Sequence, residues 1–215
     1  MYLTQLEINP LRRQARLLLA NPQAMHAVIM RICCPENGER VLWRIDDTDA
    51  GVFLYLVSPK PPKIANLNAE IGWSRKEAKT VSYAGLLDSL HEGDCYAFRL
   101  TANPVHTVTI AGRKKRYGHV TVQQQKEWFL RKAEIAGFIV RKISADEDKE
   151  IADFIVHGRK IQTFQRQGKS VTINTASFSG TLCVVDPVLL RKALVEGIGP
   201  AKAYGCGLLT LARII

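Results

Sequence analysis

The chain has 215 residues, of which 47% are hydrophobic and 23% are charged, and its formal net charge is +10. This composition excludes a disordered or collagen-like chain and is typical of a globular protein long enough to bury its own core. The longest uninterrupted apolar run, residues 52–57, is far shorter than the ~18 residues that a membrane-spanning helix needs. The first residues lack the charged-then-apolar layout of a signal peptide, so we expect no membrane association.

The charge is distributed unevenly along the chain. Residues 1–100 carry a net charge of +1, whereas residues 101–215 carry +9. A basic half beside a nearly neutral half favours a polyanionic partner, nucleic acid in particular, for the C-terminal part. The alternative is a basic surface that is simply solvated.

The cysteines indicate the redox compartment. They number five, an odd count, and form no C-x-x-C pair. This pattern predicts free thiols in a reducing cytoplasm, and it argues against a disulfide framework or a zinc site. No redox role is assigned to Cys33, Cys34 or Cys206.

The first half of the chain alternates strand and helix patterns. An alternating apolar strand ends before Pro10, and a polar, arginine-rich connection follows. Asn21 and Pro22 predict a helix start, as N-cap and first helical residue, and Pro35 follows the helix end. The later segments are strands at 41–45 and 52–57, an excursion over 58–79, a short strand at 80–84, a helical turn at 86–90 and a strand at 95–100.

The second half shows a similar rhythm. Gly137 is expected to cap the end of a helix over residues 123–136, and Asp186 to begin a second helix that ends at Gly197. The predicted strands are 107–111, 161–167, 171–176, 181–185 and 208–214, with a basic loop after the first and a hairpin turn at 168–170.

Strand–helix–strand–strand–helix–strand, about twice over, is the element order of the ferredoxin-like fold. We therefore predict an α+β protein with two tandem ferredoxin-like (RRM-like) domains, covering residues 1–92 and 93–215. No sequence repeat relates the halves, so this prediction rests on element order alone.

The most distinctive segment is residues 197–209, where a lysine and four glycines lie between a helix end and a strand. It lacks the Gly-Lys-Ser/Thr of a Walker loop, and Lys202 stands where a dinucleotide fingerprint needs its third glycine. Glycines permit positive φ and bring backbone N–H groups close to a partner, while a lysine supplies a charge suited to phosphate. The alternative is a tight structural turn. The glycines are Gly197, Gly199, Gly205 and Gly207.

The segment G-I-G-P-A-K-A-Y-G-C-G-L-L resembles the C-terminal signature of CRISPR-associated RNA-processing proteins. Met1-Tyr-Leu-Thr, residues 98–104, and residues 162–170 with 178–182 resemble other signatures of these proteins. In this order they resemble the CasE subfamily, the precursor-crRNA endoribonuclease of type I-E Cascade. The resemblance implies tandem ferredoxin-like domains and cleavage at the base of a repeat hairpin without metal or cofactor. It also implies that the product is kept and that other Cascade subunits are partners. We expect the isolated chain to be a monomer.

Cleavage of RNA without metal needs a base at the 2′-oxygen, an acid at the leaving 5′-oxygen and positive charge near the phosphorane. Histidine suits proton transfer because its reference pKa is about 6.5. His26 lies on the first predicted helix, at the edge of its apolar stripe. From the sequence alone, an ordinary surface histidine is the alternative. The family's catalytic histidine falls on this helix, so the resemblance implies that His26 is catalytic.

Two catalytic partners carry over from the family less directly. The family often has a tyrosine three residues before the histidine; this chain has Gln23, which can hydrogen-bond but cannot exchange a proton near neutral pH. The basic residue five positions after the histidine is Arg31, a candidate stabiliser of the phosphorane. On an ideal helix Arg31 would lie about 140° from His26, so the two pair only if the helix frays or a loop folds back.

Other acidic and histidine residues give weaker signals. Asp46, Asp47 and Asp49 could suggest a cation site, but they occupy a predicted hairpin and are interpreted as turn residues. Two rival functions stay open: a metal-dependent phosphodiesterase that uses these aspartates, and a non-catalytic RNA-binding subunit of the same fold. The remaining histidines have no metal-ligand spacing and are interpreted as structural or exposed: His91, His106, His119 and His157.

Basic side chains cluster in two segments, the loop after residue 111 and the predicted hairpin near residue 168. A thin basic hairpin can enter the deep, narrow major groove of A-form RNA, where it mainly reads shape and phosphate. Simple solvation is the alternative for each side chain, and no RRM-type aromatic motif predicts base stacking on an open sheet. The RNA-binding candidates, besides Lys202, are Arg113, Lys114, Lys115, Arg116, Arg159, Lys160, Arg166 and Lys169.

Overall fold

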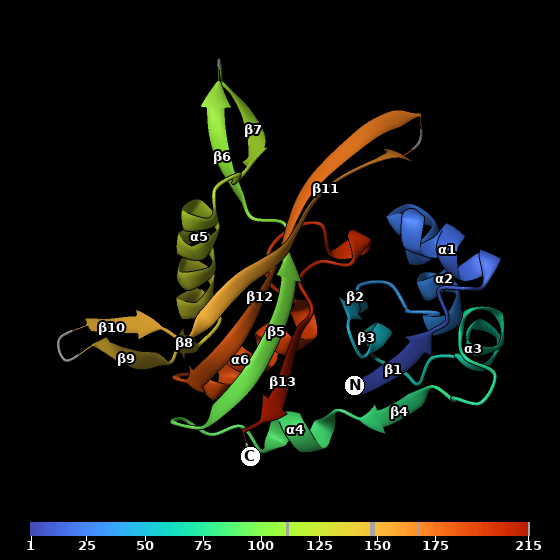
Figure 1. Cartoon of the computed structure of the whole chain (residues 1–215), viewed down its shortest axis with the longest axis horizontal. Helices are drawn as coiled ribbons and strands as arrows, with labels where there is room; N and C mark the ends of the chain where they lie inside the picture. The colour runs from blue at the N-terminus through green and yellow to red at the C-terminus, as the bar shows by residue number, and fades with distance from the viewer. Residues whose placement is uncertain (111, 147–148, 167, 215) are drawn as a thin grey trace.

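The chain folds into two domains of sheet and helix that lie side by side (Figure 1). The computed structural model describes residues 1–110, 112–146, 149–166 and 168–214. The fold is α+β with antiparallel sheets, as predicted. Within the described ranges, none of the helices has the length and apolar character to cross a bilayer.

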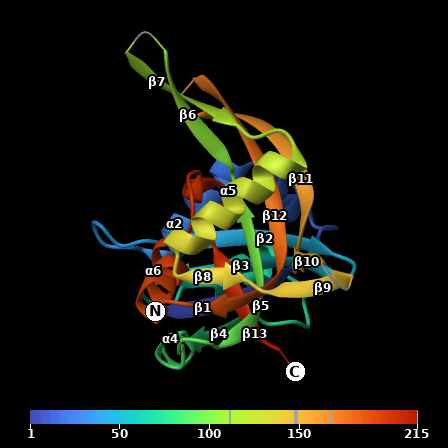
Figure 2. The ribbon, with the colours of Figure 1, turned by 90° about the vertical axis from the view of Figure 1, so that its left-hand side faces the viewer.

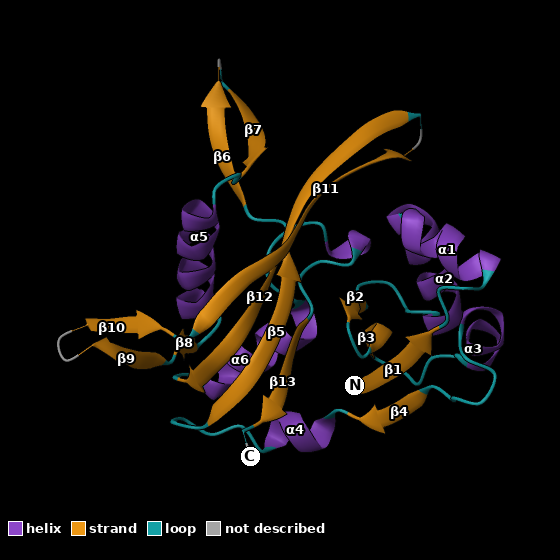
Figure 3. Ribbon diagram, in the orientation of Figure 1, coloured by secondary structure: helices purple, strands orange, loops and turns teal. Residues whose placement is uncertain are grey.

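The N-terminal domain is built on a four-stranded antiparallel sheet in the order β2-β3-β1-β4. Figure 3 shows its helices gathered on one side of this sheet. Helices that follow β1 and β3 and cover one face of such a sheet define a ferredoxin-like domain. Its elements are β1 (Tyr2–Ile8), α1 (Arg13–Ala20), α2 (Pro22–Cys33), β2 (Leu42–Thr48), β3 (Gly51–Ser58), α3 (Ala65–Ile71) and β4 (Lys79–Ser82).

The C-terminal domain repeats this arrangement. Its sheet has the order β11-β12-β5-β13, with β8 also paired to β12, so the edge and central strands occupy the same relative places as in the first domain. The predicted tandem ferredoxin-like architecture is therefore confirmed. Its elements are β5 (Cys95–Ala102), α5 (Val122–Ile135), β8 (Phe138–Val140), β11 (Phe154–Arg166), β12 (Lys169–Val184), α6 (Pro187–Glu196), η1 (Lys202–Tyr204) and β13 (Leu209–Arg213).

Two hairpins and a short linking helix are added to this framework. The helix α4 (Ala84–Asp88) links the two sheets, and β9 (Lys142–Asp146) and β10 (Lys149–Ala152) form a side hairpin. A second hairpin, β6 (Val105–Ile110) with β7 (Arg113–Gly118), lies between β5 and α5. In Figures 1 and 2 this hairpin and the far part of the β11–β12 hairpin project from the same end of the molecule.

Side-chain caps explain where the well-predicted helices begin. The Asn21 side chain accepts hydrogen bonds from the backbone N–H groups of Gln23 and Ala24, both at 3.1 Å, and Pro22 follows as first helical residue. Asp186 caps α6 in the same way. These caps satisfy N–H groups that no helical carbonyl can reach. The starts predicted at Asn21 and Asp186 are confirmed.

Several other elements differ from the prediction. The arginine-rich connection contains α1, and the excursion over 58–79 contains α3. Neither helix has a side-chain cap at its N-terminus, so the sequence carries no start signal for them. Residues 171–176 and 181–185 belong to one long strand, β12, that continues through the residues between them.

The basic loop predicted after residue 111 is a strand. Residues 113–118 form β7, which pairs with β6 in register from Val105 opposite Gly118 to Ile110 opposite Arg113. Strand prediction failed here because charged side chains replace the apolar alternation that a strand over a core would show. The hairpin projects from the domain, so its side chains do not need to be apolar (Figure 1).

The hydrophobic core consists of two clusters that meet at the N-terminal sheet. One cluster lies between this sheet and its helices and includes Leu6, Ile29 and Trp43. The other fills the C-terminal domain but also takes in Leu42 and Val57 from the N-terminal sheet. The sheet of the first domain is therefore buried on both faces. The boundary between residues 92 and 93 stays a prediction.

A cross-strand disulfide corrects the prediction for the cysteines. Cys95 on β5 and Cys183 on β12 are direct partners in the sheet register, and a disulfide joins them across 88 residues of sequence. Strand pairing, which sequence spacing does not reveal, brings the two together. Cys33, Cys34 and Cys206 are free, and burial raises the pKa of the Cys33 and Cys206 thiols to about 12, so both are unreactive.

Candidate active site and nucleic-acid interface

The helix α2 carries the predicted catalytic residues into the space between the domains. It packs against η1 and β11 of the C-terminal domain. Pro22 and Met25 line a cavity where these elements meet. His26 is half-buried and follows Pro22 by one helical turn, about 40° around the axis, so it lies on the cavity side of α2.

Gln23 and Arg31 lie at different places around the same helix. Gln23 is half-buried and precedes His26 by three residues, so the two are neighbours on the helix surface. Arg31 is exposed, and α2 continues unbroken to Cys33. The helix therefore does not fray before Arg31, which points about 140° away from His26.

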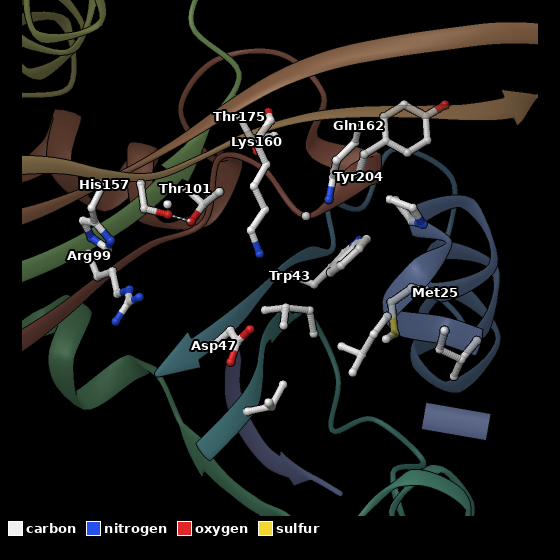
Figure 4. Close-up of a pocket in the computed structure, with 18 of the residues that line it drawn as sticks. Met25, Trp43, Asp47, Arg99, Thr101, His157, Lys160, Gln162, Thr175 and Tyr204 are labelled. Atoms are coloured by element: carbon white, nitrogen blue, oxygen red, sulfur yellow. Dashed lines mark hydrogen bonds between the residues drawn. The ribbon is translucent and has the colours of Figure 1, made fainter. Parts of the chain in front are cut away.

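The cavity beside α2 is enclosed by both domains (Figure 4). We call it the interdomain cavity; its volume is about 430 Å³. Trp43 and Met25 form part of its wall on the N-terminal side, and Lys160, Gln162 and Thr175 face them from the C-terminal domain. The predicted RNA-binding residue Lys160 thus reaches toward the N-terminal domain from the base of the hairpin.

A second hollow, which we call the basic groove, lies between η1, the β6–β7 hairpin and α5, and has a volume of about 680 Å³. Its cationic lining residues are Arg40, Arg116, Lys132 and Lys202. Burial, followed by the charges of Arg40 and Lys132, lowers the pKa of Lys202. Such a concentration of like charge favours binding of a polyanion, because phosphates relieve the repulsion.

Strand alternation divides the basic run on β7. Arg113 and Lys115 point to one face of the hairpin and Arg116 to the other, since neighbouring strand residues alternate. Arg116 lines the basic groove, whereas Arg113 and Lys115 are exposed outside it. The side chain of Lys114 lies outside the described residues.

The β11–β12 hairpin brings its basic residues to separate places. Arg159 donates to the backbone carbonyl of Val120, which ties the hairpin base to the start of α5. Lys169 is exposed near the tip, where it pairs with Arg166, whose side chain is outside the described part. The register shifts between His157 and Lys160, so a bulge at the base redirects the strand.

The glycine-rich segment is a structural wall between the two hollows. Gly197, Gly199, Gly205 and Gly207 all have positive φ, and a Cβ on Gly205 would lie 2.9 Å from the Trp43 ring. The positive φ expected of these glycines is confirmed, and at Gly205 a side chain would be both strained and sterically excluded. Tyr204, next to Gly205, lines the interdomain cavity and the basic groove alike.

The aspartates do not form one site. Asp46 lies on β2, only 5% exposed, and its carboxylate is held by the guanidinium of Arg44 at 2.7 and 2.8 Å. It is a buried strand residue, so its interpretation as a turn residue is wrong. Asp47 lines the interdomain cavity instead. Across the described ranges, no group of three His, Cys, Asp or Glu side chains is placed to hold a metal ion.

Sequence reasoning missed several residues of these hollows, among them Arg40, Trp43, Lys132 and Tyr204. Arg40 and Lys132 are isolated charges in the sequence. Trp43 fitted the alternation of a core strand, and Tyr204 was seen only as part of the glycine-rich motif. Only the packing of distant segments brings them together.

Comparisons with known proteins agree with this architecture. Residues 1–213 match the sequence family described as CRISPR associated protein. The chain is 30% identical over 221 residues to the CRISPR-associated endoribonuclease Cse3 of Thermus thermophilus, covering 99% of this chain and all of that protein. The chain belongs to the CRISPR-associated protein family. The resemblance predicted from the four sequence signatures is confirmed.

Three further comparisons agree with this assignment. It is 33% identical over 117 residues to the Cascade subunit CasE of Escherichia coli, covering 54% of this chain and 57% of that one. The structure of T. thermophilus Cse3 bound to an RNA representing a pre-cleavage complex superposes with a TM-score of 0.80 at 28% identity, covering 99% and 98% of the two chains. The crystal structure of Cas6e from E. coli matches over both full chains with a TM-score of 0.66 and 26% identity.

Proposed function

We propose that this family member is an endoribonuclease that cleaves precursor CRISPR RNA at the base of its repeat hairpin and keeps the mature crRNA. One observation carries the proposal. The basic groove and the α2 helix that bears His26 are joined through η1, which lines the groove and packs against α2. A duplex held by its phosphates in the groove therefore has its end beside a group suited to proton transfer.

The reaction is a transesterification, in which phosphorus exchanges its bond to the 5′-oxygen for a bond to the neighbouring 2′-oxygen. The 2′-oxygen loses its proton to a base and attacks the phosphorus, while the bond to the 5′-oxygen breaks and that oxygen gains a proton. The products are a 2′,3′-cyclic phosphate and a free 5′-hydroxyl, and no metal enters this scheme. His26 performs one of the two proton transfers, and Gln23 orients the substrate by hydrogen bonds.

Two residues are candidates for supplying positive charge near the phosphorane, one on η1 and one on α2. Lys202 belongs to η1, which packs against α2, and its ammonium group faces the basic groove. Arg31 contributes only if the RNA also reaches the opposite side of α2, because its side chain points away from His26.

The partners in this proposal are the repeat hairpin RNA and other Cascade subunits. The relatives include a Cascade subunit, CasE of E. coli, and the isolated chain is proposed to be a monomer that works in the cytoplasm.

A second candidate function is a non-catalytic RNA-binding subunit, and Gln23 favours it because an amide cannot transfer a proton near neutral pH. Incubation of the repeat RNA with excess protein in EDTA distinguishes the two. Cutting in EDTA with a cyclic phosphate end supports the proposed enzyme. Tight binding without cutting supports the alternative, and cutting only after a divalent metal is added contradicts both.

A further inference from the structure

The interdomain cavity contains a buried donor without a partner. Trp43 is 3% exposed and lines the cavity, yet its indole Nε1 has no hydrogen-bond partner. A buried N–H left unpaired is costly and therefore uncommon in folded proteins. Figure 4 shows this indole below Gln162 and Tyr204, at the wall of the cavity. This hydrogen bond is therefore left for a molecule that enters the cavity.

The two sides of the cavity differ in chemical character. The N-terminal side of the cavity is largely apolar, and its lining includes Leu18, Met25 and Val52 as well as Trp43. The opposite side is polar and largely cationic. Its side chains include those of Thr101, Thr175, His157, Lys160 and Arg99, and the one carboxylate among the described lining residues is Asp47.

The cations on the polar side are only partly engaged. Lys160 extends into the middle of the cavity (Figure 4). Arg99 has its Nε 3.4 Å from the Asp46 carboxylate, an ion-pair distance, but that Nε makes no hydrogen bond. The His157 Nε2 shares a 3.0 Å hydrogen bond with the hydroxyl of Ser179. Lys160 and Arg99 therefore have donors left for an anion.

An apolar slot with one N–H donor at one side and cations at the other matches a single nucleotide. Unpaired bases are typically held against aromatic side chains and read by hydrogen bonds at their edges. A volume of about 430 Å³ falls in the range of small-molecule sites. Tyr204 lines this cavity and the basic groove together, so a strand that leaves a duplex in the groove meets the cavity directly.

We propose that the interdomain cavity binds one unpaired nucleotide that flanks the repeat hairpin. Its base lies against Trp43 and accepts a hydrogen bond from the indole Nε1, and its phosphate lies near Lys160. This inference rests on the proposed function, since it assigns a place to a nucleotide next to the hairpin. Because His26 lies on the cavity side of α2, the site would hold the RNA backbone in place beside it.

The test compares affinities for uncleavable repeat hairpins, with 2′-deoxy nucleotides at the hairpin base. One hairpin is blunt, and two others carry a single extra nucleotide at the 3′ or the 5′ end. Base stacking alone contributes roughly 1–3 kcal/mol, which is about 5- to 150-fold in affinity. We expect one of the two extensions to increase the affinity of the wild-type protein at least 5-fold. If neither extension increases it, the inference is wrong.

Trp43→Phe keeps an aromatic ring but removes the N–H group. We expect it to lower the gain from the extra nucleotide by about 2- to 10-fold, since one hydrogen bond is lost while the ring remains for stacking. Trp73→Phe is the matched control, because Trp73 lines a separate hollow beside α3, and it should keep the full gain. An equal gain in both variants overturns the role of Trp43. If Trp43→Phe does not fold, Lys160→Gln, at the exposed base of the hairpin, replaces it. This variant should likewise lower the gain in affinity from the extra nucleotide.

An abasic extension separates the base from its phosphate. Loss of the gain with the abasic nucleotide supports a bound base, whereas an unchanged gain shows that only the phosphate is held and contradicts the inference. Failure of the proposed function looks different. In that case the wild-type protein would bind the blunt hairpin no better than an unrelated stem, which overturns the proposed function and the inference with it.

Discussion

Arg44 Nη1 on β2 donates a 2.8 Å hydrogen bond to the backbone carbonyl of Leu208, across 164 residues of sequence and from one domain to the other. The same nitrogen donates to the carbonyl of Arg99 at 2.9 Å, and Nη2 donates to the hydroxyl of Thr210 at 2.9 Å. The guanidinium also donates to the carboxylate of Asp46, so it makes hydrogen bonds to both domains. Arg44 itself is only 1% exposed. This residue fixes the position of the N-terminal sheet against β5 and β13.

Replacement of Arg44 by leucine should destabilise the protein strongly. It leaves the carboxylate of Asp46 buried without its main partner, a change that typically costs about 3–5 kcal/mol. Urea unfolding followed by circular dichroism measures the effect. The double variant Arg44→Leu with Asp46→Leu removes both charges and should recover most of the stability. A single variant within ~1 kcal/mol of the wild type would contradict this role.

His26→Ala should abolish cleavage but not binding. Removing a general acid or base typically lowers the rate about 10²- to 10⁴-fold. Affinity for the hairpin should change by less than about 2-fold, since interactions with phosphates dominate it. Single-turnover cleavage and filter binding measure the two quantities. His91→Ala, on an exposed histidine, is the matched control and should cut normally. An unchanged rate for His26→Ala would eliminate His26 as catalyst.

Substitutions of Gln23 test whether a second titratable group can assist His26 in proton transfer. If a phenol next to His26 transfers a proton, Gln23→Tyr should accelerate single-turnover cleavage by about 10-fold, the low end of acid–base effects. If hydrogen bonding alone matters, Gln23 already supplies it, and only Gln23→Ala should be slow. Rates across pH 5 to 9 separate the two. Three identical profiles would remove position 23 from the reaction.

The salt dependence of binding should locate the duplex. Each phosphate that the protein no longer neutralises should lower the slope of log K against log salt by roughly 0.7 to 0.9. Arg116→Gln with Lys202→Gln, both in the basic groove, should lower the slope more than Arg113→Gln with Lys115→Gln on the other face of β7. Arg75→Gln, an exposed arginine of the N-terminal domain, is the control. An intact slope in the groove variant would place the RNA elsewhere.

The sequence predicted those elements whose signals are local. Asn21 and Asp186 begin helices with their own side chains, and the ferredoxin-like fold followed from the succession of elements. Helix α1 was missed because Arg12, at its N-cap position, makes no side-chain capping hydrogen bond. The helix has only 8 residues, so its amphipathic pattern extends over little more than two turns.

The candidate site was only partly predictable for a related reason. His26 was found through its helix and its family resemblance. Arg44 and Asp46 are two residues apart and point to the same face of β2, yet Asp46 was interpreted as a turn residue because it begins an aspartate-rich run. The cavity near Trp43 and the groove at Lys202 arise from segments far apart in the chain, so no local pattern could show them.

The burial of the N-terminal sheet on both faces has a mechanical consequence. Leu42 and Val57 are built into the core of the other domain, so the two domains cannot turn against each other as hinged bodies without exposing that core. The helix with His26 and the groove with Lys202 thus keep their spacing before any RNA arrives. In such a rigid frame the RNA is the partner that must bend or unstack. Its deformability becomes a criterion of substrate choice, and repeats with a weakly stacked base should be cut in preference to stiff ones.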